Sequence, residues 1–349
     1  YARNMHVTAE DVDASVVIPE IDLRLDNVKG RMQIEKGLLI VDGDQARVGN
    51  SRGKNGHLVL GLPNDDFTFK LDVDLDADLA ELPGVLGRLV HYKPFQDELA
   101  RFSNVSGRAT GHLHLGDQLR NFDVTVNVAT MQGKGHYAPL AQDFVVDAGG
   151  MTIAPPMVQW RNIRGTYGPH VVKNSTGQVH FPDDIFLEVT QLDAVLSAKD
   201  LEKENLSYFK EISGALHEYI TRANGRIELR NTTISSKASD PKQWKANADV
   251  SVKNLAVETP SFPQPILFKE GKAHLSDTAI SVSDASGTIL GDSFTLGASL
   301  THQNFTALRG KISLQGKVGQ GLGQWLKNKH LVAPSLFPHL PCAVESLQI

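Results

Sequence analysis

Residues 67–79 read FTFKLDVDLDADL, and this stretch decides the fold class. Apolar residues occupy every second position, while the positions between them carry Thr68, Lys70 and four aspartates. A period of two is typical of a β-strand with one dry face and one wet face. The stretch therefore predicts a half-buried strand whose acidic side lies in water. On this basis Asp72→Asn is expected to change little.

The same alternation recurs along the chain and predicts one continuous apolar face. Parallel α/β sheets would show uninterrupted apolar strands separated by regular helices, so an antiparallel sheet fits better. This face could line an open groove, or it could be the filled core of a closed sandwich or barrel. The candidate groove-lining residues are Phe67, Phe69, Leu71, Val73, Leu75, Phe122, Val124, Val126, Val128, Leu187, Val189, Ile227, Leu229, Val250, Val252, Ile312 and Leu314.

The composition argues against several classes of function. Lys and Arg number 35 against 40 for Asp and Glu, so no basic excess is available to neutralise a nucleic-acid backbone. The single cysteine, Cys342, rules out an intrachain disulfide framework. No apolar run reaches the ~18 residues of a membrane-spanning helix, and the first residue is Tyr1. The chain is expected to be a fragment whose targeting peptide and membrane anchor lie outside it.

Helical periodicity is confined to three places. It predicts insertions at about 79–103, 199–220 and 321–329, which recur roughly every 120 residues and are expected to pack across the sheet. Two further sets of markers share this register, Pro19, Pro139 and Pro260, and Gly43, Gly165 and Gly287. The shared register predicts three repeats, a partial first one over 1–106, a second over 107–224 and a third over 225–349.

Two strings near the C-terminus resemble the AsmA-like family of bacterial envelope proteins. They are GKAHLSDTAISVSDASGTILGDSFTLGASL at 271–300 and LRGKISLQGKVGQGLGQWL at 308–326. Glycines fall where such sequences place turns between short amphipathic strands, at Gly271, Gly287, Gly291, Gly297 and Gly310. The same style covers nearly the whole chain, although the helical insertions are larger than in the simplest family pattern.

The resemblance implies an all-β fold with an elongated, twisted and curved antiparallel sheet, the repeating β-groove, and a few short helical insertions. It implies that the apolar face binds phospholipid acyl chains and moves phospholipid between the inner and outer membranes. Such a protein would extend through the periplasm from an inner-membrane anchor. The resemblance does not identify its protein partners in the envelope. The alternative is a structural or assembly module of the envelope with a closed β core.

The sequence carries no enzyme signature. It has no GxSxG, HExxH, phosphate-binding glycine loop or Rossmann fingerprint, so neither catalysis nor a cofactor is expected. A β-rich carbohydrate-active enzyme would need paired carboxylates in an aromatic cleft, and aromatic residues make up only 7% of the chain.

No metal site is expected either. His112 and His114 share one strand face, a spacing seen in metal sites, but no third ligand is evident near them in the sequence. The aspartates of residues 72–78 lack the glycine turn and the terminal glutamate of a calcium loop.

Overall fold

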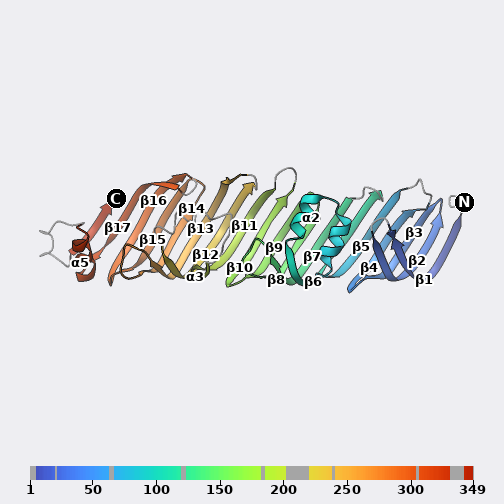
Figure 1. Cartoon of the computed structure of the whole chain (residues 1–349), viewed down its shortest axis with the longest axis horizontal. Coiled ribbons are helices and arrows are strands. Elements are labelled where there is room, and N and C mark those ends of the chain that lie inside the picture. Colours follow the sequence, from blue (N-terminus) through green and yellow to red (C-terminus); the bar gives the residue numbers. More distant parts are fainter. Residues whose placement is uncertain are drawn as a thin grey trace. The chain divides into compact units, whose positions relative to one another are not determined.

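The fold is all-β, as the sequence predicts. The computed structural model describes residues 5–19, 22–62, 67–118, 123–181, 185–201, 220–237, 240–303, 306–330 and 342–348. Over these residues the strands pair antiparallel, the sheet is not closed, and the helices are few and short (Figure 1).

The chain divides into two compact units. Unit 1 comprises Tyr1–Ala138, Gln142–Tyr167 and Thr176–Ile185, and unit 2 comprises Pro139–Ala141, Gly168–Ser175 and Phe186–Ile349. The strand β10 (His170–His180) has residues in both. The division into three repeats stays a prediction.

Unit 1 is an antiparallel meander in which each strand from β1 to β9 pairs with the next strand in the chain. Its strands are β1 (His6–Ile18), β2 (Leu23–Glu35), β3 (Leu38–Val48), β4 (Ser51–Gly61), β5 (Thr68–Asp78), β6 (Phe102–Gln118), β7 (Asp123–Tyr137), β8 (Phe144–Ala154) and β9 (Met157–Tyr167). The helices α1 (Leu82–Leu89) and α2 (Lys93–Leu99) connect β5 to β6.

Unit 2 repeats this plan from β11 to β18, again with antiparallel pairing between consecutive strands. Its strands are β11 (Phe186–Ser197), β12 (Arg222–Lys237), β13 (Asp240–Glu258), β14 (Ile266–Leu275), β15 (Ala279–Ile289), β16 (Asp292–Gln303), β17 (Thr306–Val318) and β18 (Cys342–Gln348). Its described helices are α3 (Ala198–Leu201) and α5 (Gln320–Asn328).

Two of the three predicted helical insertions lie where the sequence places them. The insertion at 79–103 is the pair α1 and α2, and the insertion at 321–329 is α5. Of the insertion at 199–220, the structure describes α3 and residue 220, and residues 202–219 lie outside the described residues. In unit 1 the helices pack across the sheet, as predicted. Leu86, Leu89 and Phe95 are buried in the same core as the strand residues.

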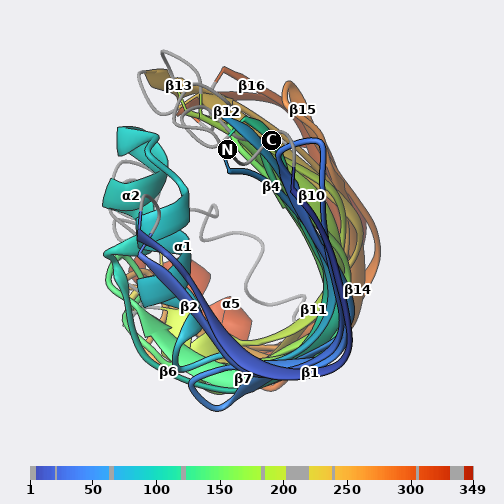
Figure 2. The same cartoon turned by 90° about the vertical axis from the view of Figure 1, so that its right-hand side faces the viewer.

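Strands of both units bend at bulges formed by asparagine or aspartate. Asn27, Asn55, Asn231 and Asp284 have φ angles of 53°, 52°, 49° and 52°, and the pairing register shifts beside each one. A bulge leaves one residue unpaired and increases local bending and twist. Asparagine and aspartate tolerate this left-handed conformation better than other side chains do. Figure 2 shows the resulting curvature of β1, β2, β6 and β7, with α1 and α2 across the open side.

Asn254 offers a direct test of this origin of curvature, because it is exposed and has a φ of 50° within β13. Asn254→Val is expected to lower the free energy of unfolding by about 1–2 kcal/mol, since a β-branched residue is strained in this conformation. Asn254→Gly is expected to change it by less than about 0.5 kcal/mol. Chemical denaturation measures both. Equal losses would show that the asparagine side chain, and not the backbone conformation, stabilises this bulge.

Side chains that follow three glycine turns contact the start of the helical insertions. The turn residues Gly49, Gly168 and Gly291 all have positive φ. After the first turn, the Ser51 hydroxyl accepts a hydrogen bond from the Asp78 amide at the end of β5. After the second, His170 Nδ1 accepts one from the Ser197 amide at the end of β11.

The third turn contacts α5 directly. Beside Gly291, the Asp292 carboxylate accepts a hydrogen bond from the Leu322 amide in the first turn of the helix. The start of each insertion is thus held by the side chain of a residue that follows a glycine turn, in both units.

Candidate functional site

The candidate site is the apolar face of the strands, here called the inner face and defined in each unit by itself. In unit 1 it is the face on which α1 and α2 pack, and in unit 2 it is the face that carries Leu229 and Val250. In unit 1 the cross-strand register aligns Val73 with Leu113, Leu113 with Val126, and Val126 with Ile153. All four side chains are buried. The alternation in residues 67–79 therefore assigned the faces of β5 correctly: Phe69, Leu71 and Val73 are buried, while Lys70 is exposed.

The predicted groove-lining residues differ in burial between the two units. In unit 1, Phe69, Leu71, Val73, Val124, Val126 and Val128 are buried, and Phe67 and Leu75 are partly buried. Phe122 lies outside the described residues. In unit 2, all of the candidates are only partly buried, namely Leu187, Val189, Ile227, Leu229, Val250, Val252, Ile312 and Leu314.

A single apolar row crosses seven strands of unit 2. Neighbouring members are directly opposite one another in the pairing register, from β11 to β17. The row consists of Ala194, Leu229, Val250, Ala273, Val282, Ala298 and Ile312. None of its side chains is charged, and all but Ala194 are partly exposed. The row is therefore an apolar strip that water reaches.

Sequence reasoning missed four members of this row. Ala194, Ala273, Val282 and Ala298 belong to strands in which serine, glycine and alanine dilute the apolar alternation. The missed signal was the alternation itself, because Ala273 and Leu275, or Ala298 and Leu300, are two positions apart.

In unit 1 the same face is covered. Leu86, Leu89 and Val90 of the helical segment and Phe95 of α2 are buried against the sheet. The expectation of an open groove along consecutive strands does not hold over β5–β7, where Val126 is 7% exposed. Helices fill the concave side there because their apolar side chains remove both surfaces from water.

Each unit has a pocket on its inner face. In unit 1, a cavity of about 110 Å³ separates α1 from the sheet. Its walls include Leu25, Val41 and Leu58 from the strands, and Leu82 and Val85 from the helix.

In unit 2, a more open pocket of about 710 Å³ lies over β13–β17. Phe268 and Phe294 meet edge to face there, with ring centroids 5.6 Å apart. Gly287 lies between them in the register, and a β-carbon on it would come within 2.1 Å of the Leu267 carbonyl oxygen and 3.0 Å of the Phe294 ring. Glycine therefore allows the close approach of the β14 backbone as well as that of the Phe294 ring.

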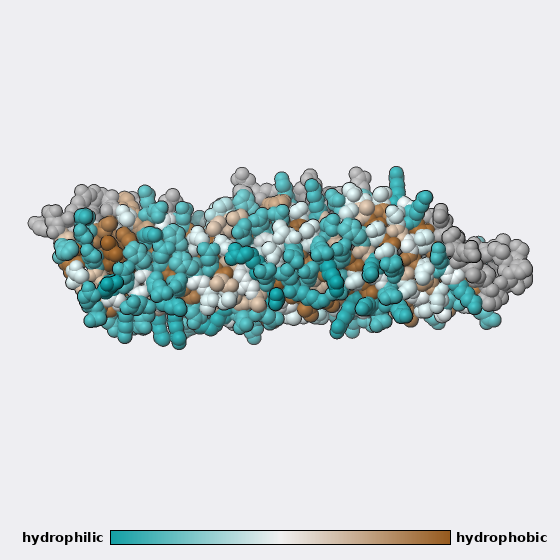
Figure 3. All heavy atoms as spheres, turned by 180° about the vertical axis from the view of Figure 1, so that it is seen from behind, coloured by the Kyte–Doolittle hydropathy of each residue, from teal (hydrophilic) through white to brown (hydrophobic). Residues whose placement is uncertain are grey.

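The outer face of the sheet is different in character. Figure 3 views the molecule from behind the helices and shows a largely hydrophilic surface with scattered hydrophobic residues. In unit 1 this face has a row of alternating aspartate and histidine across β3–β6, in the order Asp42, His57, Asp72 and His114.

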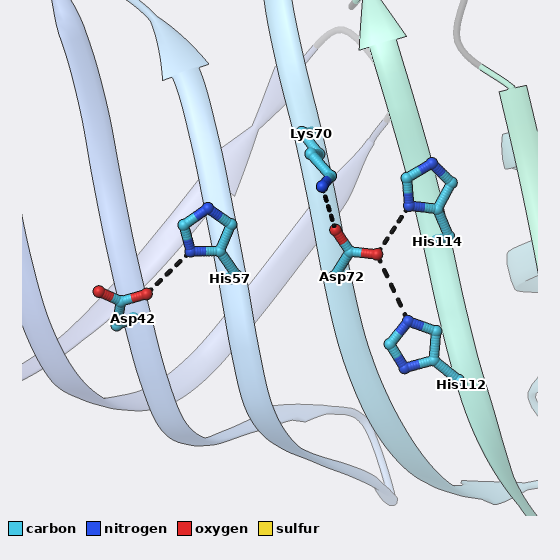
Figure 4. Close-up of polar contacts among 6 residues, drawn as sticks. All are labelled: Asp42, His57, Lys70, Asp72, His112 and His114. Atoms are coloured by element: carbon cyan, nitrogen blue, oxygen red, sulfur yellow. Dashed lines mark hydrogen bonds and ion pairs between the residues drawn. The ribbon is translucent and has the colours of Figure 1, made fainter.

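Asp72 is the centre of this outer row (Figure 4). Its carboxylate lies 2.7 Å from His114 Nδ1, 3.4 Å from His112 Nε2 and 3.1 Å from Lys70 Nζ. Burial acts to raise the pKa of Asp72, but hydrogen bonds from His114, Lys70 and His112 outweigh it and lower the pKa to about 2. The hydrogen bond with Asp74 raises the pKa of His112.

Two sequence expectations change at this row. Acidic groups do lie beside His112 and His114, because β5 places Asp72 and Asp74 opposite them; only strand pairing could reveal this proximity. Among the described residues, no group of three His, Cys, Asp or Glu side chains is arranged to hold a metal ion. Asp72 has three partners, so Asp72→Asn is no longer expected to be neutral.

Asp72→Asn is expected to destabilise unit 1 by roughly 1 kcal/mol at pH 7, because a lowered carboxylate pKa stabilises the fold wherever the group is ionised. This contribution is present above the unfolded pKa of 3.8 and is lost as the pH falls towards about 2. Denaturation of variant and wild type between pH 7 and pH 2 measures it. Asp44→Asn, at an exposed position of β3, is the control, and a difference that persists at pH 2 would contradict the ionic origin.

Known proteins provide no direct guide to this site. No protein-family model, curated protein or solved structure matches the chain. Within the described residues, no helix has both the length and the apolar character needed to cross a membrane.

Proposed function

We propose that this chain is a lipid-binding groove module that carries phospholipid acyl chains along the inner face of its sheet. The observation that carries the proposal is the uncharged, partly exposed row across seven strands of unit 2. Soluble proteins normally expose hydrophobic residues one at a time, whereas this strip is continuous across seven strands. Covering it with acyl chains removes apolar area from water on both partners, at about 25 cal/mol per Å².

The setting of this function is the periplasm of a bacterial envelope, between the inner and outer membranes. This part of the proposal rests on the resemblance of residues 271–300 and 308–326 to the AsmA-like family. In this proposal the module acts without catalysis or a cofactor. Its ligand is a phospholipid, and nucleic acid is not a partner, because the formal net charge is −5.

A second candidate function is a structural module of the envelope with a closed core. Unit 1 favours it locally, since residues of α1 and α2 share one buried core with Val124, Val126 and Val128. The two candidates differ in unit 2, where the structural module needs no ligand on the partly exposed row.

Photo-crosslinking in cells separates them. A photoreactive residue at Val250, on the inner face, is expected to capture phospholipid that mass spectrometry identifies. The same residue at Ser251 is the matched control, because neighbouring strand positions face opposite sides of the sheet. Capture at neither position, or equal capture at both, would contradict the groove function.

A further inference from the structure

The cavity of unit 1 lies between the inner face of the sheet and α1. Its strand walls come from β1 to β6, and its helix wall is Leu82, Val85 and Leu89. Three glycines, Gly43, Gly53 and Gly56, also line it. A glycine has no side chain, so these three positions leave space between the sheet and α1 unfilled. The space is bounded mainly by aliphatic groups, and a cavity of that character stays dry and accepts apolar guests.

The helix that covers the cavity is intrinsically weak. Within eight residues, α1 contains Pro83, Gly84 and Gly87. Its N-cap residue, Glu81, makes no side-chain capping hydrogen bond, and its first turn carries no acidic residue. Glycine is among the least favourable residues in a helix interior, because it has the most backbone freedom to lose.

Packing does not require the two glycines. A β-carbon built on Gly84 or Gly87 would meet no heavy atom within 4 Å. Alanine would therefore fit at both positions without a clash and would strengthen the helix. The weakness of α1 is thus a property of its own sequence and not a consequence of its contacts with the sheet.

The polar contacts of α1 lie at its ends. At the start, the Glu81 carboxylate accepts hydrogen bonds from the Asn50 amide, at 2.8 Å, and from the Ser51 hydroxyl, at 3.0 Å. At the end, Gln96 Nε2 donates to the carbonyl oxygens of Gly87 and Val90, and the exposed Arg88 side chain forms an ion pair with Asp22 at 3.6 Å. Between these points the helix contacts the sheet through apolar side chains.

By contrast, α2 is anchored. The Tyr92 hydroxyl, just before α2, donates a hydrogen bond to the carbonyl of Phe181. The Phe95 ring meets the Phe181 ring edge to face, with centroids 6.0 Å apart. A displacement of α1 can therefore leave α2 in place, with the two helices still joined through residues 90–92.

We propose that this cavity binds the terminal segment of one lipid acyl chain and that α1 is the movable wall that admits it. The inference rests on the proposed function, and it adds a defined chain-end site to the inner face. An apolar cavity of 150 Å³ accommodates benzene, so a volume of about 110 Å³ accepts roughly four carbons of a chain. An acyl chain suits the site because it makes the same aliphatic contacts as Leu82 and Val85, and needs no polar partner.

The test uses the whole chain with phosphatidylglycerol vesicles in which one acyl chain of the lipid ends in a diazirine. After irradiation, mass spectrometry locates the adducts. In the wild-type protein, adducts are expected on the cavity walls, in residues 41–58 and 71–89, as well as on β12 and β13.

The double variant Gly84→Ala/Gly87→Ala is expected to raise the melting temperature and to reduce cavity labelling at least threefold. Each substitution shifts the helix equilibrium by about fivefold towards the ordered state. Labelling of β12 and β13 should not change. Glu81→Gln weakens the hydrogen bonds from Asn50 and Ser51 to residue 81. This variant is expected to increase cavity labelling.

Each contrary result has a separate meaning. A stabilised double variant with undiminished cavity labelling would exclude α1 as the movable wall. Labelling of β12 and β13 without any cavity adduct would overturn the chain-end site and leave the proposed function standing. Absence of labelling in both units would overturn the proposed function as well.

Discussion

Val250→Asp is expected to reduce the phospholipid recovered with the protein by at least about tenfold. The side chain lies in the middle of the apolar row of unit 2, between Leu229 and Ala273. A carboxylate there would have to lose its hydration wherever an acyl chain covers it, and an unpaired charge costs several kcal/mol to bury. Since 1.4 kcal/mol corresponds to tenfold in affinity, the loss should be at least of that size. Lipid extraction and mass spectrometry measure it.

Two controls make this result specific. Ser251→Asp introduces the same charge one position along, on the opposite face of β13, and should leave the lipid yield unchanged. Val250→Ala shortens the side chain but keeps the row apolar, and it should retain most of the lipid. Circular dichroism checks that all three variants are folded. If Val250→Asp kept its lipid in a folded protein, the row would not be the binding surface.

Phe69→Ala is expected to destabilise unit 1 by about 3–5 kcal/mol, the range for removing a fully buried aromatic ring. Phe69 is 0% exposed, in the core shared by the strands and the two helices. Its loss leaves a cavity that β5 and its neighbours cannot close without breaking their hydrogen-bonded register. Chemical denaturation, followed with a probe in unit 1, measures the change.

Phe67→Ala is the matched comparison, because residue 67 has the same parity just before β5 but is only partly buried. Its loss of stability should be clearly smaller, since less apolar surface returns to water. A loss as large as that of Phe69→Ala would mean that position 67 is as important to the unit 1 core as position 69.

The sequence by itself predicted an antiparallel sheet, the faces of β5 and the positions of the short helices. Alternation in residues 67–79 fixed which side chains of β5 point inward, because successive strand residues face opposite sides. Helical periodicity located α1, α2 and α5, since a period near 3.6 separates them from the strands. The bulges at asparagines such as Asn55 and Asn254 became evident only from the backbone, where both residues have positive φ.

Only the tertiary structure decided which strand positions lie side by side. No local pattern states that Asp72 lies opposite His114, or that Ala273 joins Val250 and Val282 in one row, because these relations depend on strand register. Nor does periodicity tell whether an apolar face is covered. In unit 1, Val126 is buried in a core that includes residues of the helices, whereas Val250 in unit 2 stays partly exposed. The two valines occur in similar alternating stretches, and their difference arises from what packs against them.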